Sequence, residues 1–333
     1  MRKHRIYTVT ANPALDLSGH VPKIIPNEKN YVRNSRLDPG GNGINAARIA
    51  RRLGADPVLL GFIGGGAGEQ LKGLLDKEGL SYRFTPIQGM TRTNVTVTND
   101  EDHLQTRLTF PGPKIRNIEI RALFSAVRKL KAPGVIVLGG SAPSGHPSTF
   151  YPSLIRAAQS RGLGVMVDVP VPFLKGVFKA RLKKLLFIKP NQTEFEGLTG
   201  KKFTNDLEIA REACRLLKSC EMICVSLADR GAILAWRGQA WFFKAPRVRA
   251  RGTVGSGDSM VGAVAVALAK KGLTLAGQIA HTERESVLDS ICWGIAAGAA
   301  TATTEGTSLG DASLIRRLHS KCSVQLIYTE KSR

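Results

Sequence analysis

Residues 253–258 read Thr-Val-Gly-Ser-Gly-Asp, and residues 259–269 continue without a break as Ser-Met-Val-Gly-Ala-Val-Ala-Val-Ala-Leu-Ala. The first part is a turn of small residues, and the second predicts a buried helix. Gly255 and Gly257 allow the backbone to approach a ligand closely because neither carries a Cβ atom. The first N–H groups of such a helix have no partner within the helix, so this turn is suited to hold an anion.

Asp258 is the unusual residue of this turn. A carboxylate beside an anion hole indicates a base that acts next to a group with developing negative charge. The turn alone also fits a simpler interpretation, in which the glycines form a tight helix start and Asp258 caps the first turn. The choice between the two depends on what else the chain places near this turn.

The composition is that of a globular α/β protein. The chain has 333 residues, 43% of them hydrophobic, and 35 glycines, enough for one large domain or for one domain with an appendage. No apolar stretch reaches the roughly 18 uncharged residues of a membrane helix. The basic N-terminus is followed by a segment that is too short and too polar for a secretory signal. We therefore expect a cytoplasmic protein without a membrane partner.

The formal net charge of +22 does not by itself indicate a nucleic-acid partner. Lysine and arginine are dispersed, without the basic tail or aromatic-interleaved stripe that nucleic-acid binders show. A positive field could steer phosphorylated substrates, although a surface that is merely basic explains the charge equally well. The cysteines match no zinc pattern, and we expect free, buried thiols: Cys214, Cys220, Cys224, Cys292 and Cys322.

The order of the predicted elements indicates a parallel sheet. Strands are expected at residues 5–10, 57–63, 134–139, 163–169, 185–188 and 222–227, and a hairpin near 232–243. Helices are expected at about 46–53, 68–77, 148–160, 206–218 and 286–303, from 311, and directly after Asp258. Strands that alternate with helices predict a three-layer α/β/α sandwich, in which a mostly parallel central sheet is covered on both faces.

Two regions do not fit in that core. Residues 15–37 contain no sustained helix pattern, and residues 88–110 include a hairpin around 99–102. We expect these regions to form together a small β-sheet lid over one edge of a single domain. The glycine-rich residues 64–68 lack the G-x-G-x-x-G spacing and predict a flexible turn rather than a dinucleotide loop.

Polar residues gather where the predicted strands end, which is where open α/β sheets bind their ligands. These residues combine hydroxyl-recognising carboxylates and amides, glycines that can cradle phosphate, and the oxygen ligands that Mg²⁺ prefers. They are Asp16, Gly40, Gly41, Gly43, Asn45, Ser141, Asp168, Lys189, Asn191, Glu194, Ser226 and Asp258. The chain has neither a Walker A run nor the motifs of protein kinases, and no histidine follows a core strand to complete a Ser/His/Asp set.

Four segments of this set resemble the motifs of the ribokinase-like PfkB carbohydrate kinases, in the order of that family. The segments are residues 40–47 (GGNGINAA) with the glycines at 54, 61 and 64, residues 189–194 (KPNQTE), residues 225–227 (VSL) and residues 253–260 (TVGSGDSM). The match covers essentially the whole chain, and four motifs in order are specific. The resemblance implies a ribokinase-like fold, and it favours the base beside an anion hole over a simple helix cap.

Three further segments are similar to the phosphosugar branch of that family: residues 10–16 (TANPALD), 91–94 (TRTN) and 110–112 (FPG). That branch holds minor-type bacterial 6-phosphofructokinases, 1-phosphofructokinases and tagatose-6-phosphate kinases. The similarity is greatest to the first group, because 1-phosphofructokinases often carry lysine at the Asn42 position and because Gly112 follows Pro111. The resemblance implies ATP-dependent phosphorylation of a hexose phosphate in glycolysis, foremost of fructose 6-phosphate to fructose 1,6-bisphosphate, with the other two activities as alternatives.

By this resemblance, Asp258 is the base that takes the proton of the acceptor hydroxyl, and the backbone of Gly255 and Gly257 stabilises the transferring phosphoryl group. Asn191 and Glu194 would orient Mg²⁺ and its waters, although the same pair is typical of a helix N-cap. Nucleotide contacts are expected from Lys189, Asn191, Ser226, Thr253, Gly255 and Gly257.

The resemblance assigns sugar recognition to the lid and to the ends of the strands. Lys29, Arg92 and Arg107 would hold the phosphate already on the sugar, because a fork-shaped guanidinium suits a phosphate; for Lys29, a solvated lysine is the alternative. Arg92 and Lys29 argue against a kinase for nucleosides or unphosphorylated sugars. The remaining substrate contacts are expected from Asp16, Gly40, Gly41, Asn45, Ser141 and Asp168.

Two departures from the family pattern leave parts of the site open. Ala228 stands where the family often has glycine, which affects the adenosine side, and Val169-Pro170 stand where relatives have small hydroxyl residues. Relatives bind K⁺ near the anion hole, here near Val254 and the 299–306 loop, and commonly form homodimers through the lid. An inactive sugar-sensing or RNA-associated protein is a distant alternative, disfavoured because every catalytic position is filled.

Overall fold

The computed structural model describes residues 5–145 and 148–330. Its strands are β1 (Arg5–Thr10), β2 (Ala14–Val21), β3 (Arg33–Gly40), β4 (Val58–Ile63), β5 (Ser81–Tyr82), β6 (Thr85–Pro86), β7 (Arg92–Asn99), β8 (Gln105–Leu108), β9 (Gly134–Gly139), β10 (Gly164–Asp168), β11 (Leu185–Ile188), β12 (Cys220–Ser226), β13 (Gly231–Trp236), β14 (Gln239–Lys244) and β15 (Ser323–Thr329).

The α-helices are α1 (Asn42–Arg52), α2 (Gly65–Lys77), α3 (Asn117–Arg128), α4 (Phe150–Gln159), α5 (Val171–Lys179), α6 (Gln192–Thr199), α7 (Asp206–Arg215), α8 (Ser256–Lys270), α9 (Ala276–Ile279), α10 (Arg284–Ala302) and α11 (Ala312–His319). Two short 3-10 helices are η1 (Leu216–Lys218) and η2 (Ala228–Arg230). Within the described residues, none of these helices combines the length and the hydropathy that crossing a bilayer would require.

The large sheet is mostly parallel, as the alternation of elements predicted. Its strand order is β15-β14-β13-β12-β11-β10-β9-β1-β4-β5, and β6 pairs with β4. The strands from β12 to β5 run parallel, whereas β13, β14 and β15 are antiparallel to their neighbours. Polar groups at the carboxyl ends of the parallel strands therefore come to one edge.

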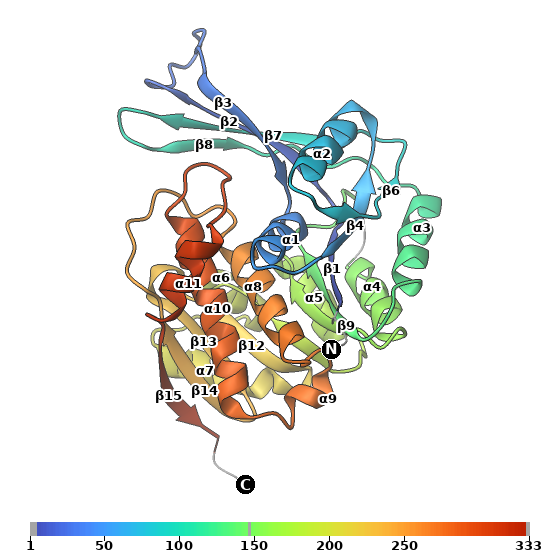
Figure 1. The fold of residues 1–333 in the computed structure, drawn as a ribbon, viewed down its shortest axis with the longest axis vertical. Coiled ribbons are helices and arrows are strands. Elements are labelled where there is room, and N and C mark those ends of the chain that lie inside the picture. The colour runs from blue at the N-terminus through green and yellow to red at the C-terminus, as the bar shows by residue number, and fades with distance from the viewer. Residues whose placement is uncertain (1–4, 146–147, 331–333) are drawn as a thin grey trace.

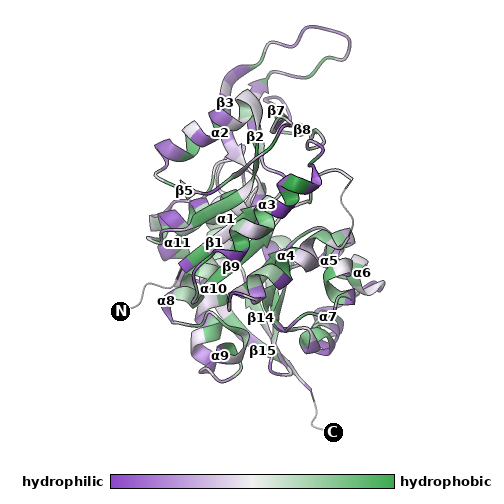
Figure 2. Cartoon of the chain, turned by 90° about the vertical axis from the view of Figure 1, so that its right-hand side faces the viewer, coloured by the Kyte–Doolittle hydropathy of each residue, from purple (hydrophilic) through white to green (hydrophobic). Residues whose placement is uncertain are grey.

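Helices cover both faces of this sheet (Figure 1), because its strands are apolar on both sides. In β9, Val135 and Val137 pack into the core that α1, α8, α10 and α11 share. The intervening Ile136 and Leu138 belong to the core with α3, α4, α5 and α7. Figure 2 shows the hydrophobic central strands between helices with hydrophilic outer positions. The predicted three-layer α/β/α sandwich is confirmed.

A second, smaller sheet has the order β3-β2-β7-β8. The pairs β2–β3 and β7–β8 are antiparallel, and β2–β7 is parallel. Figure 1 shows this sheet at one end of the molecule, apart from the large sheet. The residues predicted to form a lid, including the hairpin that links β7 to β8, thus form a separate small sheet.

Two helices begin earlier than predicted, at Asn42 instead of residue 46 and at Gly65 instead of residue 68. Glycine has a low intrinsic helix propensity, so glycine-rich segments predict turns. In these two helices, contacts with distant segments favour the helical conformation of the glycines instead. A Cβ atom on Gly43 would lie 2.7 Å from the backbone oxygen of Val9 in β1, so the first turn of α1 can approach the sheet only with glycine.

Some elements have no clear signal in the sequence pattern. Helices α3 and α5 and strand β15 were not predicted, and β15 pairs antiparallel with β14 at the edge of the large sheet. Short apolar runs do not by themselves distinguish a strand from a buried helix segment. The cysteines are free, as expected; four are buried and Cys322 is half-buried.

Candidate active site

The turn before α8 places Asp258 in the first turn of the helix. Gly255 adopts a left-handed φ of 75°, and a Cβ atom there would lie 2.8 Å from Cδ2 of Leu309, so both backbone conformation and space favour glycine. The Asp258 carboxylate accepts a hydrogen bond at Oδ2 from Nδ2 of Asn45, over 2.9 Å. Asn42 donates a second side-chain hydrogen bond to the same carboxylate.

Helices α1 and α8 touch through their backbones, which brings these amides to Asp258. A Cβ atom on Gly262 would lie 2.4 Å from the backbone oxygen of Ala46, so glycine permits the close approach. Asn42 and Asn45 are three residues apart on α1 and therefore share a face of the helix. The two glycine-rich motifs of the sequence are thus parts of one site.

Burial and the nearby Asp168 raise the pKa of Asp258 to about 6, against the opposing effects of Asn45, Lys189 and Asn42. A carboxylate with this pKa is ionised at pH 7 but accepts a proton more readily than an exposed aspartate. Asp258 is thus a buried carboxylate in the first turn of α8, with a pKa nearer to neutral than that of an exposed aspartate.

Lys189 lies between the turn and a second carboxylate. Its ammonium group is 3.2 Å from Oδ1 of Asp168, and a Cβ atom on Gly257 would lie 3.1 Å from the same nitrogen. The side chain is 5% exposed, and burial opposes its charge, but Asp168 and Glu194 outweigh that effect and raise the pKa of Lys189. A buried, charged lysine therefore lies at the turn before α8.

Asn191 and Glu194 form a reciprocal helix cap at the start of α6. Oδ1 of Asn191 accepts from the backbone N–H of Glu194 at 2.8 Å, and Oε2 of Glu194 accepts from the backbone N–H of Asn191 at 2.9 Å. The helix N-cap that this pair typically forms is therefore present at the start of α6. Burial raises the pKa of Glu194, with Asp168 as a second cause, so two carboxylates lie close together here.

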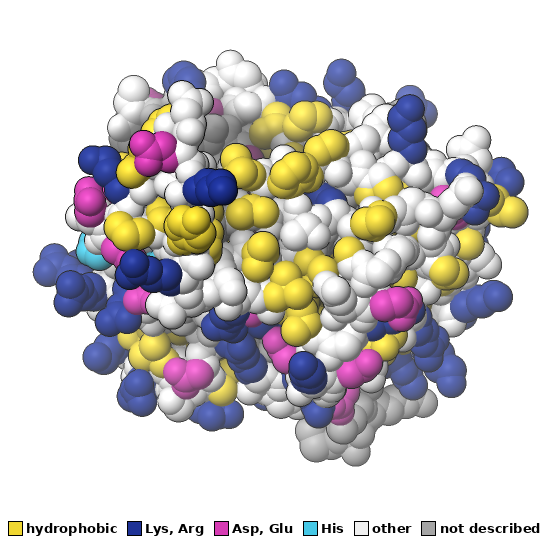
Figure 3. All heavy atoms as spheres, turned by 90° about the horizontal axis from the view of Figure 1, so that it is seen from above, with side chains coloured by type: hydrophobic (Ala, Val, Ile, Leu, Met, Phe, Trp, Pro, Cys, Tyr) yellow, Lys and Arg dark blue, Asp and Glu magenta, His cyan; other side chains and the backbone are white. Residues whose placement is uncertain are grey.

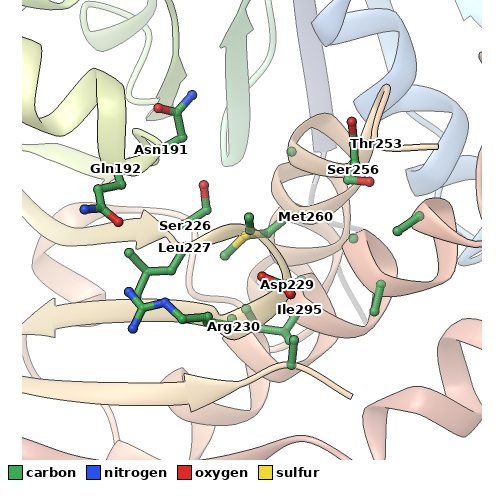
Figure 4. A pocket seen from close by; sticks show the side chains of 18 of the residues that line it. Asn191, Gln192, Ser226, Leu227, Asp229, Arg230, Thr253, Ser256, Met260 and Ile295 are labelled. Carbon is green, nitrogen blue, oxygen red and sulfur yellow. The ribbon is translucent and has the colours of Figure 1, made fainter. Parts of the chain in front are cut away.

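An open cavity of about 1120 Å³ adjoins the turn and is lined by several of the residues that were predicted to contact the nucleotide. Figure 4 shows Asn191, Gln192 and Ser226 on one side and Thr253 and Ser256 on the other. The wall formed by α8 and α10 was not predicted, and its small and apolar residues are Met260, Gly294, Ile295, Gly298 and Ala299. The Gly294–Gly298 spacing of four, one helix face, is the signal that could have indicated it.

Ala228 lines the same cavity with a φ of 54°, a left-handed conformation that glycine adopts without strain. This residue is the departure from the family pattern noted in the sequence. The backbone shape that the pattern associates with glycine is therefore kept, with alanine in its place.

The small sheet brings Asp16 towards the start of α1. Oδ1 of Asp16 accepts from Nδ2 of Asn94 at 2.9 Å, and a Cβ atom on Gly40 would lie 2.1 Å from Oδ2 of Asp16. Burial raises the pKa of Asp16, although Asn94 and Arg92 oppose the shift. The neighbouring Gly41 has a φ of 125° and precedes α1.

The three predicted phosphate cations differ in their surroundings. Arg92 donates from Nη1 to the backbone oxygen of Phe110 and from Nη2 to that of Asn12, over 3.0 and 3.1 Å, whereas its buried Nε has no partner among the described residues. Arg107 is exposed and donates to Gln105 Oε1 at 2.7 Å. Lys29 is exposed between β2 and β3. Among the described residues, no hydrogen bond or ion pair joins Lys29 or Arg107 to the surroundings of Asp258.

Ser141 follows β9 and accepts a hydrogen bond from Nδ2 of Asn12 over 3.3 Å. Asn42 was missed as a site residue, although its position three residues before Asn45 in the first motif was a usable signal. Direct contacts thus join Asn45 to Asp258 and Lys189 to Asp168. Asp16 and Ser141 contact Asn94 and Asn12 instead.

Known proteins resemble this chain in sequence and in fold. A match to the family described as pfkB family carbohydrate kinase extends over residues 9–313. The chain belongs to the PfkB family of carbohydrate kinases. The family expected from the motifs is therefore confirmed, and so is the ribokinase-like fold.

Among PfkB proteins, the chain is 31% identical to ATP-dependent 6-phosphofructokinase isozyme 2 of Escherichia coli (strain K12), over 92% of this chain and 94% of that protein. It is 30% identical to 1-phosphofructokinase of Bacillus subtilis (strain 168), over 94% and 97%. The crystal structure of phosphofructokinase-2 from Escherichia coli in complex with substrates and products has a TM-score of 0.86 at 29% identity, and the match covers 95% of this chain and 99% of that one. This PfkB chain is thus similar to sugar-phosphate kinases over more than 90% of its length.

Proposed function

We propose that the protein transfers the γ-phosphoryl group of ATP to a hydroxyl group of a hexose phosphate, with fructose 6-phosphate as the acceptor. The observation that carries this proposal is the buried carboxylate of Asp258, which has a pKa of about 6 and lies in the first turn of α8. Similarity to a 6-phosphofructokinase over nearly the whole chain supports the choice of acceptor.

In the proposed reaction, Asp258 accepts the proton of the acceptor hydroxyl as that oxygen bonds to the γ-phosphorus and the bond to ADP breaks. Backbone N–H groups at Gly255 and Gly257 stabilise the charge on the phosphoryl oxygens, which is the main catalytic demand of this chemistry. Lys189, buried beside the turn, adds a positive charge at the same place. Asn45 holds the carboxylate in position.

Mg²⁺ fits this site as an ion held mainly by the phosphates and by water. Within the described ranges, no group of three or more His, Cys, Asp or Glu side chains could hold a metal ion directly. Mg²⁺ usually keeps several waters and takes only one or two carboxylates from the protein. Asn191 and Glu194 would orient its waters, and the ion would neutralise charge on the phosphates.

Sugar recognition is assigned to Asp16, Asn45 and the backbone at Gly40 and Gly41. Arg92 would bind the existing phosphate through the N–H groups that its two hydrogen bonds to backbone carbonyls leave free, because a guanidinium carries five donors. Ser141 and Asp168 complete the proposed set on the side of the large sheet.

K⁺ and a second copy of the chain complete the proposal. Backbone carbonyls near Val254 and in the 299–306 loop would hold K⁺ beside the turn.

Figure 3 shows hydrophobic side chains gathered on the end of the molecule that carries the small sheet, and a homodimer through this sheet would cover them. The large exposed apolar residues there include Leu17, Tyr31, Val32, Leu108 and Phe110. In such a dimer, Lys29 or Arg107 would reach the partner's site.

The direct test is ADP release in one assay with fructose 6-phosphate, fructose 1-phosphate and tagatose 6-phosphate. We expect the highest kcat/KM for fructose 6-phosphate and a loss of about 100-fold or more in Asp258→Asn, since a general base contributes about 10²–10⁴. Full activity of that variant contradicts the mechanism. A preference for fructose 1-phosphate instead assigns the activity of the second relative.

A further inference from the structure

A buried hydrogen bond joins the small sheet to the loop between α10 and α11. Thr307 donates from Oγ1 to Oδ2 of Asp38 in β3 over 2.6 Å. Both residues are buried, and Asp38 is only 3% exposed. A buried carboxylate is costly unless it is paired and hydrogen-bonded, so this contact fixes the loop against β3.

Arginines complete the surroundings of the Asp38 carboxylate. Arg36 donates from Nε to Oδ1 over 2.9 Å and also from Nη1 to Oγ of Ser308 over 2.7 Å. Nη2 of Arg48, on α1, lies 3.9 Å from Oδ1. The loop is thus attached to β3 at two consecutive residues.

On one side, this contact lies beside a proposed sugar ligand. Asp38 is directly opposite Asp16 in the β2–β3 register, and directly opposite residues of an antiparallel pair have their side chains on the same face. A change in the position or charge of one carboxylate therefore acts on the other. The pKa of Asp16, raised mainly by burial, is also raised by Asp38.

On the other side, the loop reaches the start of α8. Thr304 donates from Oγ1 to the backbone oxygen of Ser308, over 2.6 Å. Oγ1 of Thr301 lies 2.8 Å from Oγ of Ser259 in α8 and accepts from the backbone N–H of Gly310 at 3.0 Å. Leu309, in the same loop, packs against Gly255. Polar and apolar contacts therefore connect the loop to the turn that holds Asp258.

We propose that the hydrogen bond between Asp38 and Thr307 couples the binding of the sugar phosphate at the small sheet to the binding of the nucleotide at the turn before α8. The inference rests on the proposed function, since it needs both ligands. Asp38 and Thr307 act here as positioning residues, because each works through neighbours and not on the reacting atoms. Coupling of this kind is reciprocal: each ligand changes the affinity for the other by the same factor.

The experiment compares Thr307→Val, which removes only the hydroxyl donor, with Thr307→Ser, which keeps it. The Kd of AMP-PNP with Mg²⁺ is measured by calorimetry with and without saturating fructose 6-phosphate. In the wild type we expect the sugar phosphate to change this Kd about 5-fold or more. Thr307→Val should reduce the factor to less than about 2-fold, and Thr307→Ser should restore it.

Ser313→Ala is the matched control, because Ser313 donates to Oδ1 of Asp311 over 2.7 Å in the same part of the chain, at the exposed start of α11. It should leave the coupling factor as in the wild type. A coupling factor in Thr307→Val equal to that of the wild type overturns the inference, as does a wild-type Kd that fructose 6-phosphate does not change. Failure to release ADP with all three hexose phosphates overturns the proposed function instead.

Discussion

The amide of Asn45 donates to the carboxylate of Asp258 across 213 positions of the sequence, with 2.9 Å between the two atoms. The contact exists because α1 and α8 meet at Gly262, where a side chain would collide with the backbone of Ala46. Asp258, the proposed base, is thus held by a residue that lies far from it in the sequence. Several consequences of this arrangement can be measured.

The rate should depend on the ionisation of Asp258. Because its pKa is raised to about 6, the carboxylate is protonated below that pH, and kcat should fall about tenfold per pH unit there. The negative charge of Asp168 raises the pKa of Asp258, and the positive charge of Lys189 lowers it.

The acidic limb of the pH profile should also depend on Asn42. The hydrogen bond from Asn42 lowers the pKa of Asp258, so Asn42→Ala should move this limb to higher pH, by about 0.5–1 unit. Asn205→Ala, which removes the cap of α7, is the control and should leave the limb in place.

An unshifted limb in Asn42→Ala would contradict the role given to this amide. A limb that shifts equally in the α7 control would show that the change in pH dependence is not specific to the site.

Asp258 should also cost stability at neutral pH. Its pKa is higher in the folded chain than the ordinary value of 3.8, so the folded state binds more protons between pH 4 and 6, and stability falls as the pH rises through that range. The cost above pH 6 is on the order of 3 kcal/mol, from 1.36 kcal/mol per unit. Asp258→Asn removes it, so the Tm of this variant minus that of the wild type should be more positive at pH 8 than at pH 4. A difference that does not change with pH contradicts this prediction.

Ala228→Gly should stabilise the protein slightly. A non-glycine residue in the left-handed region costs roughly 1–2 kcal/mol, and the greater freedom of glycine in the unfolded chain offsets about 0.4–1 kcal/mol of that gain. We expect the free energy of unfolding in urea to rise by up to about 1 kcal/mol. The control is Ala250→Gly at an exposed position, where the same change should destabilise. Equal effects at both positions would rule out relief of strain.

Gly262→Ala should separate α1 from α8. The added Cβ atom would lie 2.4 Å from the backbone oxygen of Ala46, so one helix must move. Overpacking of this kind typically costs about 1–3 kcal/mol, and the displaced amide of Asn45 should reduce kcat more than it changes the KM for ATP. Gly73→Ala in α2 is the control, since nothing lies within 4 Å of that Cβ position. It should stabilise the helix by about 0.5–1 kcal/mol and leave kcat unchanged.

Local patterns in the sequence were sufficient for the central strands of the large sheet, for most of the helices and for the turn with Asp258, but not for the edge strand β15. Glycines were misinterpreted in α1 and α2, because their helical conformation depends on contact with distant segments such as β1. The donation from Thr307 to Asp38 joins residues 269 positions apart and leaves no periodic signal. The surroundings of Arg92 could not be predicted either, because they consist of backbone carbonyls, which no side-chain pattern records.

The packing of α1 against α8 also has a consequence for biosynthesis. Protein synthesis proceeds from the N-terminus, so the residues of the first motif leave the ribosome long before α8 and the loop with Thr307 exist. Until then, the apolar face of α1 has no helical partner, and Asp38 has no Thr307 to donate to it. A growing chain therefore cannot form the proposed site until α8 and the loop with Thr307 have been synthesised, so an incomplete chain that ends before them should have no catalytic activity.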